Sequence, residues 1–163
     1  MNLEFIQELW DKDSVIDQEL LHSESIKVPA LHAKYYKIYN NILTLQKSQE
    51  TQYKILKKEK WIYYTGKAQP EVYVEKPFDY KVLKPDLDKY YDADPDLIRC
   101  TAKIEYYQIM LDYLESILKV IQNRTYQIKN AIEWQRFTNG TMDEISWISR
   151  DSWRSSVFRS SKR

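Results

Sequence analysis

Residues 94–140 read DPDLIRCTAKIEYYQIMLDYLESILKVIQNRTYQIKNAIEWQRFTNG and carry the most regular pattern in the chain. Asp94 followed by Pro95 is typical of a helix start, because a carboxylate can cap the free amides of the first turn and proline fits the first helical position. Gly140 stands just beyond the other end, where a left-handed glycine commonly ends a helix. The pattern predicts one helix from about residue 95 to about residue 138, roughly 65 Å long at 1.5 Å per residue.

Twelve positions of this helix recur at alternating spacings of three and four, which is the heptad pattern of coiled coils. Ten of the twelve are apolar or thiol, and Thr125 and Gln135 are the two that are not. Leaving out the thiol, Cys100, nine remain that we predict to mediate oligomerisation: Leu97, Ile104, Tyr107, Leu111, Leu114, Leu118, Ile121, Ile128 and Ile132.

A second apolar stripe runs beside the first and widens the face beyond what a two-stranded coil buries. It consists of Tyr106, Met110, Tyr113, Ile117 and Val120. A helix of this length exceeds the core of a 163-residue chain, so we expect copies to associate into a higher-order homo-oligomer. The alternative is a monomeric bundle that folds both stripes inward.

Proline and glycine residues mark the expected boundaries of the structural elements in the rest of the chain. We expect a short amphipathic helix over residues 3–12 and a second helix that starts at Asp17, with Pro29 interrupting or kinking it. Heptad spacing then runs from Leu31 through Leu45 and Gln52 to a helix end at Thr65-Gly66. Residues 68–96 hold four of the five prolines and predict a loop-rich connector with a short strand over 72–74.

The predicted fold is therefore mainly α, with long amphipathic helices, a coiled-coil-like C-terminal oligomerisation helix and a loop-rich connector. Four regions follow: an N-terminal helical region (1–67), an acidic, Pro-rich connector (68–96), the C-terminal helix (97–140) and a Ser/Arg-rich tail (141–163).

The composition excludes several kinds of site. Two glycines are too few for Gly-rich phosphate loops, and one cysteine excludes a disulfide framework and a Cys-based zinc site. Neither the two histidines nor the Asp92, Asp94 and Asp96 series has the neighbours that a metal site needs. No apolar run could span a membrane, and the acidic N-terminus does not fit a secretory signal, so we expect an intracellular protein. We predict no metal, no cofactor and no catalysis.

Charge is segregated along the chain although the formal net charge is only +1. Residues 1–26 carry seven acids and one base, whereas residues 27–67 carry nine lysines and two acids. A basic segment inside a neutral chain indicates one element that contacts a polyanion.

The basic segment interleaves cations with aromatic side chains between residues 53 and 67. Lysines neutralise phosphates, and exposed aromatic rings stack on unpaired bases, so the pattern favours single-stranded nucleic acid without sequence preference. The alternative is a solvated lysine face with the aromatic rings packed inward. The predicted DNA-binding residues are Lys54, Lys57, Lys58, Lys60, Trp61, Tyr64 and Lys67.

Several short motifs occur in order and in register over about residues 1–140: Lys12-Asp13, Ile16-Asp17, Tyr63-Tyr64-Thr65-Gly66, the run from Asp94 through Tyr107, Leu111-Asp112, Ala131-Ile132 and Phe137 to Gly140. Together they resemble the UvsY-type recombination mediators of T4-like bacteriophages. The connector shows little match, and the tail has no counterpart. The family's basic pair falls on Lys58 and Lys60, and its oligomerisation element falls on 97–135.

This resemblance implies a ring-like homo-oligomer that binds single-stranded DNA and contacts the phage recombinase and the phage single-strand-binding protein. Such a protein helps load the recombinase onto DNA coated by the second partner, in recombination, repair and recombination-dependent replication, in the cytoplasm of the infected bacterial host. Two alternatives stay open. One is a structural or adaptor coiled-coil protein that does not bind nucleic acid, and the other is a small enzyme with a site in the acidic connector.

Overall fold

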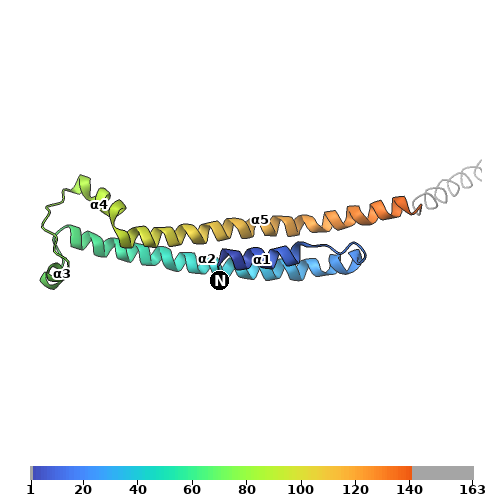
Figure 1. Ribbon diagram of the computed structural model, residues 1–163, viewed down its shortest axis with the longest axis horizontal. Helices are drawn as coiled ribbons and strands as arrows, with labels where there is room; N and C mark the ends of the chain where they lie inside the picture. The colour runs from blue at the N-terminus through green and yellow to red at the C-terminus, as the bar shows by residue number, and fades with distance from the viewer. Residues whose placement is uncertain (1, 141–163) are drawn as a thin grey trace, which may run out of the picture. The chain divides into compact units, whose positions relative to one another are not determined.

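The computed structural model describes residues 2–140, and all regular structure in that range is helical (Figure 1). The elements are α1 (Leu3–Ser14), α2 (Leu21–Tyr64), α3 (Pro70–Glu75), the 3-10 turn η1 (Lys84–Asp86), α4 (Leu87–Ala93) and α5 (Pro95–Thr138). The mainly-α prediction is confirmed. The predicted Ser/Arg-rich tail, 141–163, lies outside the described residues.

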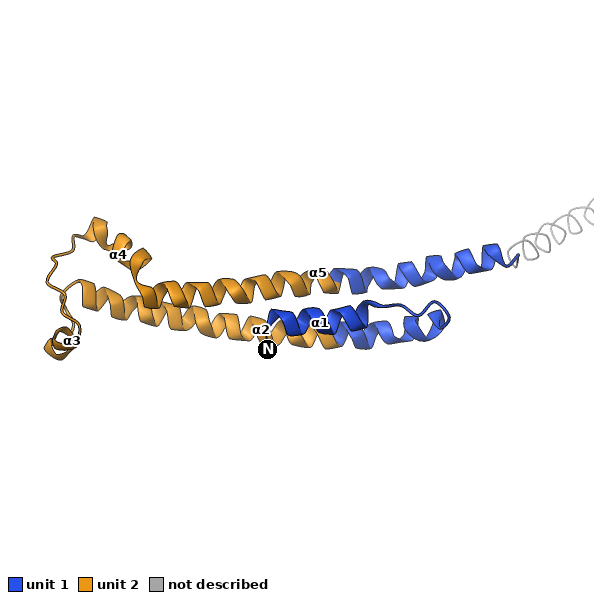
Figure 2. Ribbon diagram, in the orientation of Figure 1, with its two compact units in different colours: residues 1–33, 119–163 blue, residues 34–118 orange. Residues whose placement is uncertain are grey.

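The chain forms two compact units (Figure 2). Unit 1 comprises Met1–Ala33 and Lys119–Arg163, and unit 2 comprises Lys34–Leu118. Both boundaries fall inside helices, because α2 and α5 each contribute residues to both units.

The predicted bounds of the C-terminal helix are confirmed, since α5 runs from Pro95 to Thr138. Asp94 caps its start: Oδ1 accepts hydrogen bonds from the amides of Asp96 (2.9 Å) and Leu97 (3.2 Å). At the other end Gly140 adopts φ +72°, and its amide donates to the Phe137 carbonyl at 3.2 Å. Both ends follow from local chemistry that the sequence displays.

The predicted start of the second helix is wrong. Asp17 caps a separate turn, in which its Oδ1 accepts from the Glu19 amide at 2.9 Å, and α2 begins at Leu21. Pro29 lies inside α2 without interrupting it. The exposed position of Pro29 lets a 44-residue helix tolerate the loss of one backbone donor.

The predicted strand over 72–74 is also wrong, because these residues lie in α3. Pro70 occupies the start of that helix, where a missing N–H costs nothing. The Val72 amide donates to the Gln69 carbonyl and the Lys76 amide to the Val72 carbonyl, so the segment closes its hydrogen bonds within itself.

In unit 2 the second half of α2 runs antiparallel to the first half of α5 (Figure 1). Hydrogen bonds cross between the helices from Tyr39 Oη to Glu115 (3.1 Å) and from Gln46 Nε2 to Gln108 Oε1 (2.8 Å). The buried apolar side chains between them are Tyr35, Ile38, Ile42, Leu97, Met110, Leu111, Leu114 and Ile117.

The inward face follows the true helical period of 3.6 rather than a strict heptad. Leu45, which the heptad places in the seam, is 50% exposed, while Gln46 is buried. On α5 Thr125 is exposed and Arg124 is buried. A straight helix drifts away from a repeat of 3.5, so single predicted positions turn outward even though the seam residues Ile121 and Ile128 stay buried.

The Asp94 clasp, which we define as Asp94, Asp96, Lys60 and Tyr64, joins the start of α5 to the end of α2 within unit 2. Lys60 Nζ lies 2.8 Å from Asp94 Oδ2 and 2.7 Å from Asp96 Oδ2, and Tyr64 Oη donates to Asp94 Oδ2 at 2.7 Å. Burial raises the pKa of Asp94, but Lys60, Tyr64 and the two capping amides outweigh burial and hold that pKa below the ordinary 3.8.

Unit 1 is organised by a buried arginine. Arg124 donates from Nη1 to the carbonyl of Asp13 (2.8 Å) and from Nη2 to that of Val15 (2.8 Å), so it satisfies the end of α1. Its Nη2 also lies 2.9 Å from Glu24 Oε2, and the Lys27 ammonium approaches Glu24 Oε1 at 2.8 Å. Hydrogen bonds from Lys27 and then Arg124 hold the pKa of Glu24 below its usual value.

The nine residues that we predict to mediate oligomerisation all contribute to the packing of one unit or the other within a single chain. Five are buried: Leu97, Leu111, Leu114, Ile121 and Ile128. Four are half-buried: Ile104, Tyr107, Leu118 and Ile132. Their part in association stays a prediction, and only the five buried residues would need a rearrangement of the chain before they could contact another copy.

Replacing Arg124 with methionine should lower the free energy of unfolding by about 3–5 kcal/mol, because buried Glu24 would keep only Lys27 as a partner and the carbonyls of Asp13 and Val15 would lose their donor. Urea unfolding followed by circular dichroism measures the loss. Lys129→Met is the matched control: its ion pair with Glu133 is exposed and long, at 3.7 Å, and should contribute about 0–1 kcal/mol. Equal effects of the two substitutions would refute the role of Arg124.

Asp94→Asn should keep the helix cap, since asparagine caps well, while it removes the buried one of the two charges that Lys60 pairs with. A carboxylate with a depressed pKa stabilises the fold above its unfolded pKa, and that contribution is lost as pH falls through the folded pKa. Between about pH 6 and about pH 3, wild type should therefore lose more unfolding free energy than the variant. Parallel stability curves for the two proteins would contradict the clasp.

Candidate nucleic-acid interface

The predicted DNA-binding residues gather at the C-terminal end of α2, and the helix divides them between two sides. At about 100° per residue, Lys54, Lys57, Lys58 and Trp61 project from one flank, whereas Lys60 points toward α5. We call the four flank residues together with Lys67 the basic flank. All five are exposed.

Lys54 and Lys58 are exposed, and unlike Lys57 and Lys67 they show no cation–π contact within the described residues. They lie one helical turn apart, and no carboxylate of residues 2–140 pairs with either of them. Two exposed ammonium groups without intramolecular partners are what a phosphate backbone requires of a surface. Lys47 continues the same flank toward the middle of α2, but it pairs with Glu50 at 2.9 Å.

Lys57 occupies the border between the basic flank and the helix contact. Its Nζ lies 5.1 Å from the Tyr91 ring centroid and 6.0 Å from that of Tyr53. Both are cation–π distances, so the exposed Lys57 ammonium already interacts with the rings of Tyr53 and Tyr91.

Trp61 and Lys67 are held together by the turn that ends α2. The Gly66 amide donates to the Tyr63 carbonyl (3.2 Å) and the Lys67 amide to the Ile62 carbonyl (3.0 Å), the two bonds of a Schellman motif. Gly66 supplies the left-handed residue at φ +74°. The turn brings Lys67 Nζ over the Trp61 ring, 4.2 Å from its centroid.

Lys60 is separated from the basic flank. Its side chain is 17% exposed, and its ammonium lies between Asp94 and Asp96. Burial lowers the pKa of Lys60, but the two carboxylates outweigh burial and raise that pKa above 10.5. The charge of Lys60 is therefore neutralised within unit 2.

Tyr64 also points away from the basic flank, into an aromatic cluster that the connector supplies. Its ring centroid lies 5.2 Å from Phe78, 5.4 Å from Tyr90 and 6.3 Å from Tyr91. Tyr63 stacks on Tyr73 at 5.5 Å and completes the cluster. Burial, followed by the hydrogen bond to Asp94, raises the pKa of the Tyr64 hydroxyl well above its ordinary value.

The structure thus brings five of the seven predicted DNA-binding residues onto one surface and places Lys60 and Tyr64 beneath it. From the sequence Asp94 is recognisable only as a cap, because no local signal reveals a partner 34 residues away. The aromatic cluster was also missed, although the density of tyrosines between residues 63 and 91 was a visible signal.

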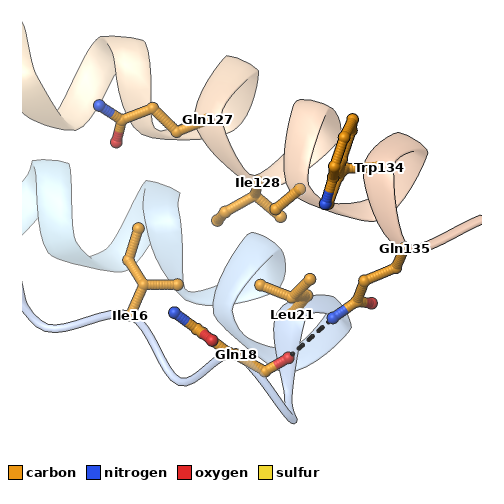
Figure 3. Close-up of a pocket in the computed structure, with 8 residues that line it drawn as sticks. Ile16, Gln18, Leu21, Gln127, Ile128, Trp134 and Gln135 are labelled. Carbon is orange, nitrogen blue, oxygen red and sulfur yellow. Dashed lines mark hydrogen bonds between the residues drawn. The ribbon is translucent and has the colours of Figure 1, made fainter. Parts of the chain in front are cut away.

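A separate apolar groove of about 370 Å³ lies in unit 1 (Figure 3). Ile128 and Trp134 from α5 face Ile16 and Leu21, and Gln135 donates to the Gln18 carbonyl at 3.4 Å. No titratable side chain lines this groove.

Over the described range, no three or more His, Cys, Asp or Glu side chains are close enough to hold a metal ion. Within that range no helix has the length and apolarity that crossing a bilayer requires.

Comparison with known proteins identifies the family. The family model described as "Recombination, repair and ssDNA binding protein UvsY" matches residues 9–141. The recombination protein uvsY of Enterobacteria phage T4 is 26% identical over 140 residues, which cover 86% of this chain and 99% of that relative.

Solved structures agree with this result. Two crystal structures of the bacteriophage T4 recombination mediator protein UvsY superpose with TM-scores of 0.76 and 0.73, both at 25% identity. Each match covers 85% of this chain, and 98% and 99% of the respective T4 chain. The expected resemblance is therefore confirmed, and the chain belongs to the UvsY family of recombination, repair and single-stranded DNA binding proteins.

Proposed function

We propose that the basic flank of unit 2 is the surface through which this chain binds single-stranded DNA. The observation that carries the proposal is the pair Lys54 and Lys58, two exposed lysines without carboxylate partners in the described range, next to the exposed ring of Trp61. Lysines neutralise phosphates whatever the base, so this surface binds without sequence preference.

Lys60 and Tyr64 have a supporting role in this proposal. Lys60 is held by two carboxylates, and the Tyr64 hydroxyl is held by Asp94, so neither polar group is available to a phosphate without breaking the Asp94 clasp. They fix the end of α2 against α5 and so set the direction of the flank. Direct contact of Lys60 or Tyr64 with DNA is the competing assignment.

The biological role we propose is that of a recombination mediator in the cytoplasm of an infected bacterial host. The mediator helps load a phage recombinase onto DNA coated by the phage single-strand-binding protein, and it contacts both proteins. No step of this role is catalytic, so the chain acts through binding alone. Family membership supports this role.

We further propose that several copies form a ring-like homo-oligomer, so that basic flanks from all copies bind one strand. Each flank offers few phosphate contacts, and linking weak sites raises the overall affinity through effective concentration. Within this proposal, the four regions that we predict from the sequence correspond to four roles: basic helix, connector, oligomerisation helix and tail. They do not coincide with the two compact units, because the boundaries of those units fall inside α2 and α5.

The double substitution Lys54→Gln/Lys58→Gln should weaken binding to an oligothymidine. It should also reduce the slope of log affinity against log salt by about 0.7 for each phosphate that is no longer neutralised, hence by about 1.4 for two phosphates. Fluorescence anisotropy across a salt series measures both. Lys119→Gln/Lys129→Gln, which removes two exposed lysines of unit 1, is the matched control and should leave the slope unchanged.

Lys60→Gln separates the two assignments of Lys60. If Lys60 supports the fold, its replacement lowers thermal stability and leaves the salt slope near the wild-type value. A slope reduced as much as for a single flank lysine, with stability preserved, would instead make Lys60 a phosphate ligand.

In solution the mass by light scattering should be several times the 19.8 kDa of one chain. Dilution below the association range should lower the DNA affinity per chain, because the linked sites separate. A mass of one chain at every concentration, with affinity independent of dilution, would refute the oligomer and the avidity argument together.

A further inference from the structure

We propose that Trp61 and Lys67 form a binding position for one unpaired nucleobase, which the Lys67 ammonium covers in the free protein. When DNA binds, a base replaces Lys67 on the Trp61 ring, and Lys67 moves to the adjoining phosphate. This inference rests on the proposed function, since it assigns a ligand and an exchange to one part of the basic flank.

Lys67 is held in position by the backbone but forms no salt bridge within the described residues. Its backbone is fixed by the Schellman motif at the end of α2, which sets its Nζ 4.2 Å from the Trp61 centroid. Within residues 2–140 no carboxylate lies within ion-pair distance of Lys67, and the side chain is exposed. A cation held only by an exposed ring face is easily exchanged, because water and phosphate oxygens compete for it.

Trp61 presents its aromatic ring to solvent, whereas the Tyr64 ring packs against other rings. Trp61 is 40% exposed, and the group that covers its ring face is the Lys67 ammonium. Tyr64 is surrounded by Phe78, Tyr90 and Tyr91 and donates its hydroxyl to Asp94. A base could stack on Tyr64 only after the aromatic cluster opened, whereas on Trp61 it displaces one lysine.

The free-energy balance favours the exchange of Lys67 for a base on the Trp61 ring. Stacking of a base on an exposed aromatic ring is worth more than an exposed cation–π contact. The displaced ammonium also gains a phosphate, so both halves of the exchange favour the bound state. Lys54 and Lys58 lie along the same flank of α2, within two turns of Trp61, and bring the strand to this position.

The test uses the full chain with Trp10, Trp134, Trp147 and Trp153 replaced by phenylalanine, so that Trp61 is the only tryptophan. An oligothymidine and an abasic oligonucleotide of equal length, which keeps the phosphates and lacks bases, are the two probes. Oligothymidine should quench Trp61 fluorescence, and the abasic strand should bind without that quenching. Lys67→Ala, whose short side chain cannot cover the ring, should make Trp61 more accessible to acrylamide in the free protein.

Affinities in the otherwise wild-type chain give a second readout. Trp61→Leu should weaken oligothymidine binding by about tenfold and leave abasic binding unchanged, because leucine keeps an apolar side chain but offers no ring. Lys67→Met should reduce the salt slope by about 0.7. Trp134→Leu, at a 66% exposed tryptophan of unit 1, is the matched control and should change neither affinity.

Two results would overturn the inference while the proposed function stands. One is oligothymidine binding with Trp61 fluorescence and acrylamide quenching unchanged. The other is an equal loss of affinity for both probes in Trp61→Leu. Failure of both probes to bind the wild-type chain would instead refute the proposed function itself.

Discussion

Unit 2 depends on one buried carboxylate. Asp94 is 3% exposed, and its two oxygens receive the amides that start α5, the ammonium of Lys60 and the hydroxyl of Tyr64. A lone buried charge would be strongly destabilising, but four donors around one carboxylate offset its desolvation. The same side chain therefore starts one helix, holds the end of another and anchors the connector's aromatic cluster. The direction in which the last turns of α2 present their lysines follows from this arrangement.

The helical period places lysines that are close in sequence on different sides of α2, where one faces solvent and another packs against α5. Lys58 and Lys60 are two positions apart, which on a helix places them on different sides, so one faces solvent and the other faces α5. Trp61 and Tyr64 are only about 60° apart on the helix, and they differ because Trp61 is 40% exposed while Tyr64 is half-buried against Phe78. A basic and aromatic segment thus contributes both to the packing of unit 2 and to a surface rich in exposed cations, without separate segments for each.

Sequence reasoning succeeds where the signal is local. The bounds of α5 follow from Asp94-Pro95 and Gly140, and the end of α2 follows from Thr65-Gly66. It fails where packing decides: the heptad pattern placed Leu45 and Thr125 inward, while the real period buries Gln46 and Arg124. Residue types that suit phosphates and bases are visible in residues 53–67. Which of them remain available depends on partners such as Asp94, which lie far away in the sequence and leave no local trace.

Arg124 has a consequence for the order in which the chain acquires its structure. The carbonyls of Asp13 and Val15 accept hydrogen bonds from the Arg124 side chain, which lies about 110 positions later in the sequence. During synthesis from the N-terminus, α1 must therefore wait for most of the polypeptide before its last turn is satisfied. Residues 34–118 are contiguous, so unit 2 has all of its own contacts available before unit 1 does. Unit 2 can therefore pack while α5 is still incomplete, whereas α1, although made first, gains its Arg124 contacts only after residue 124 has been added.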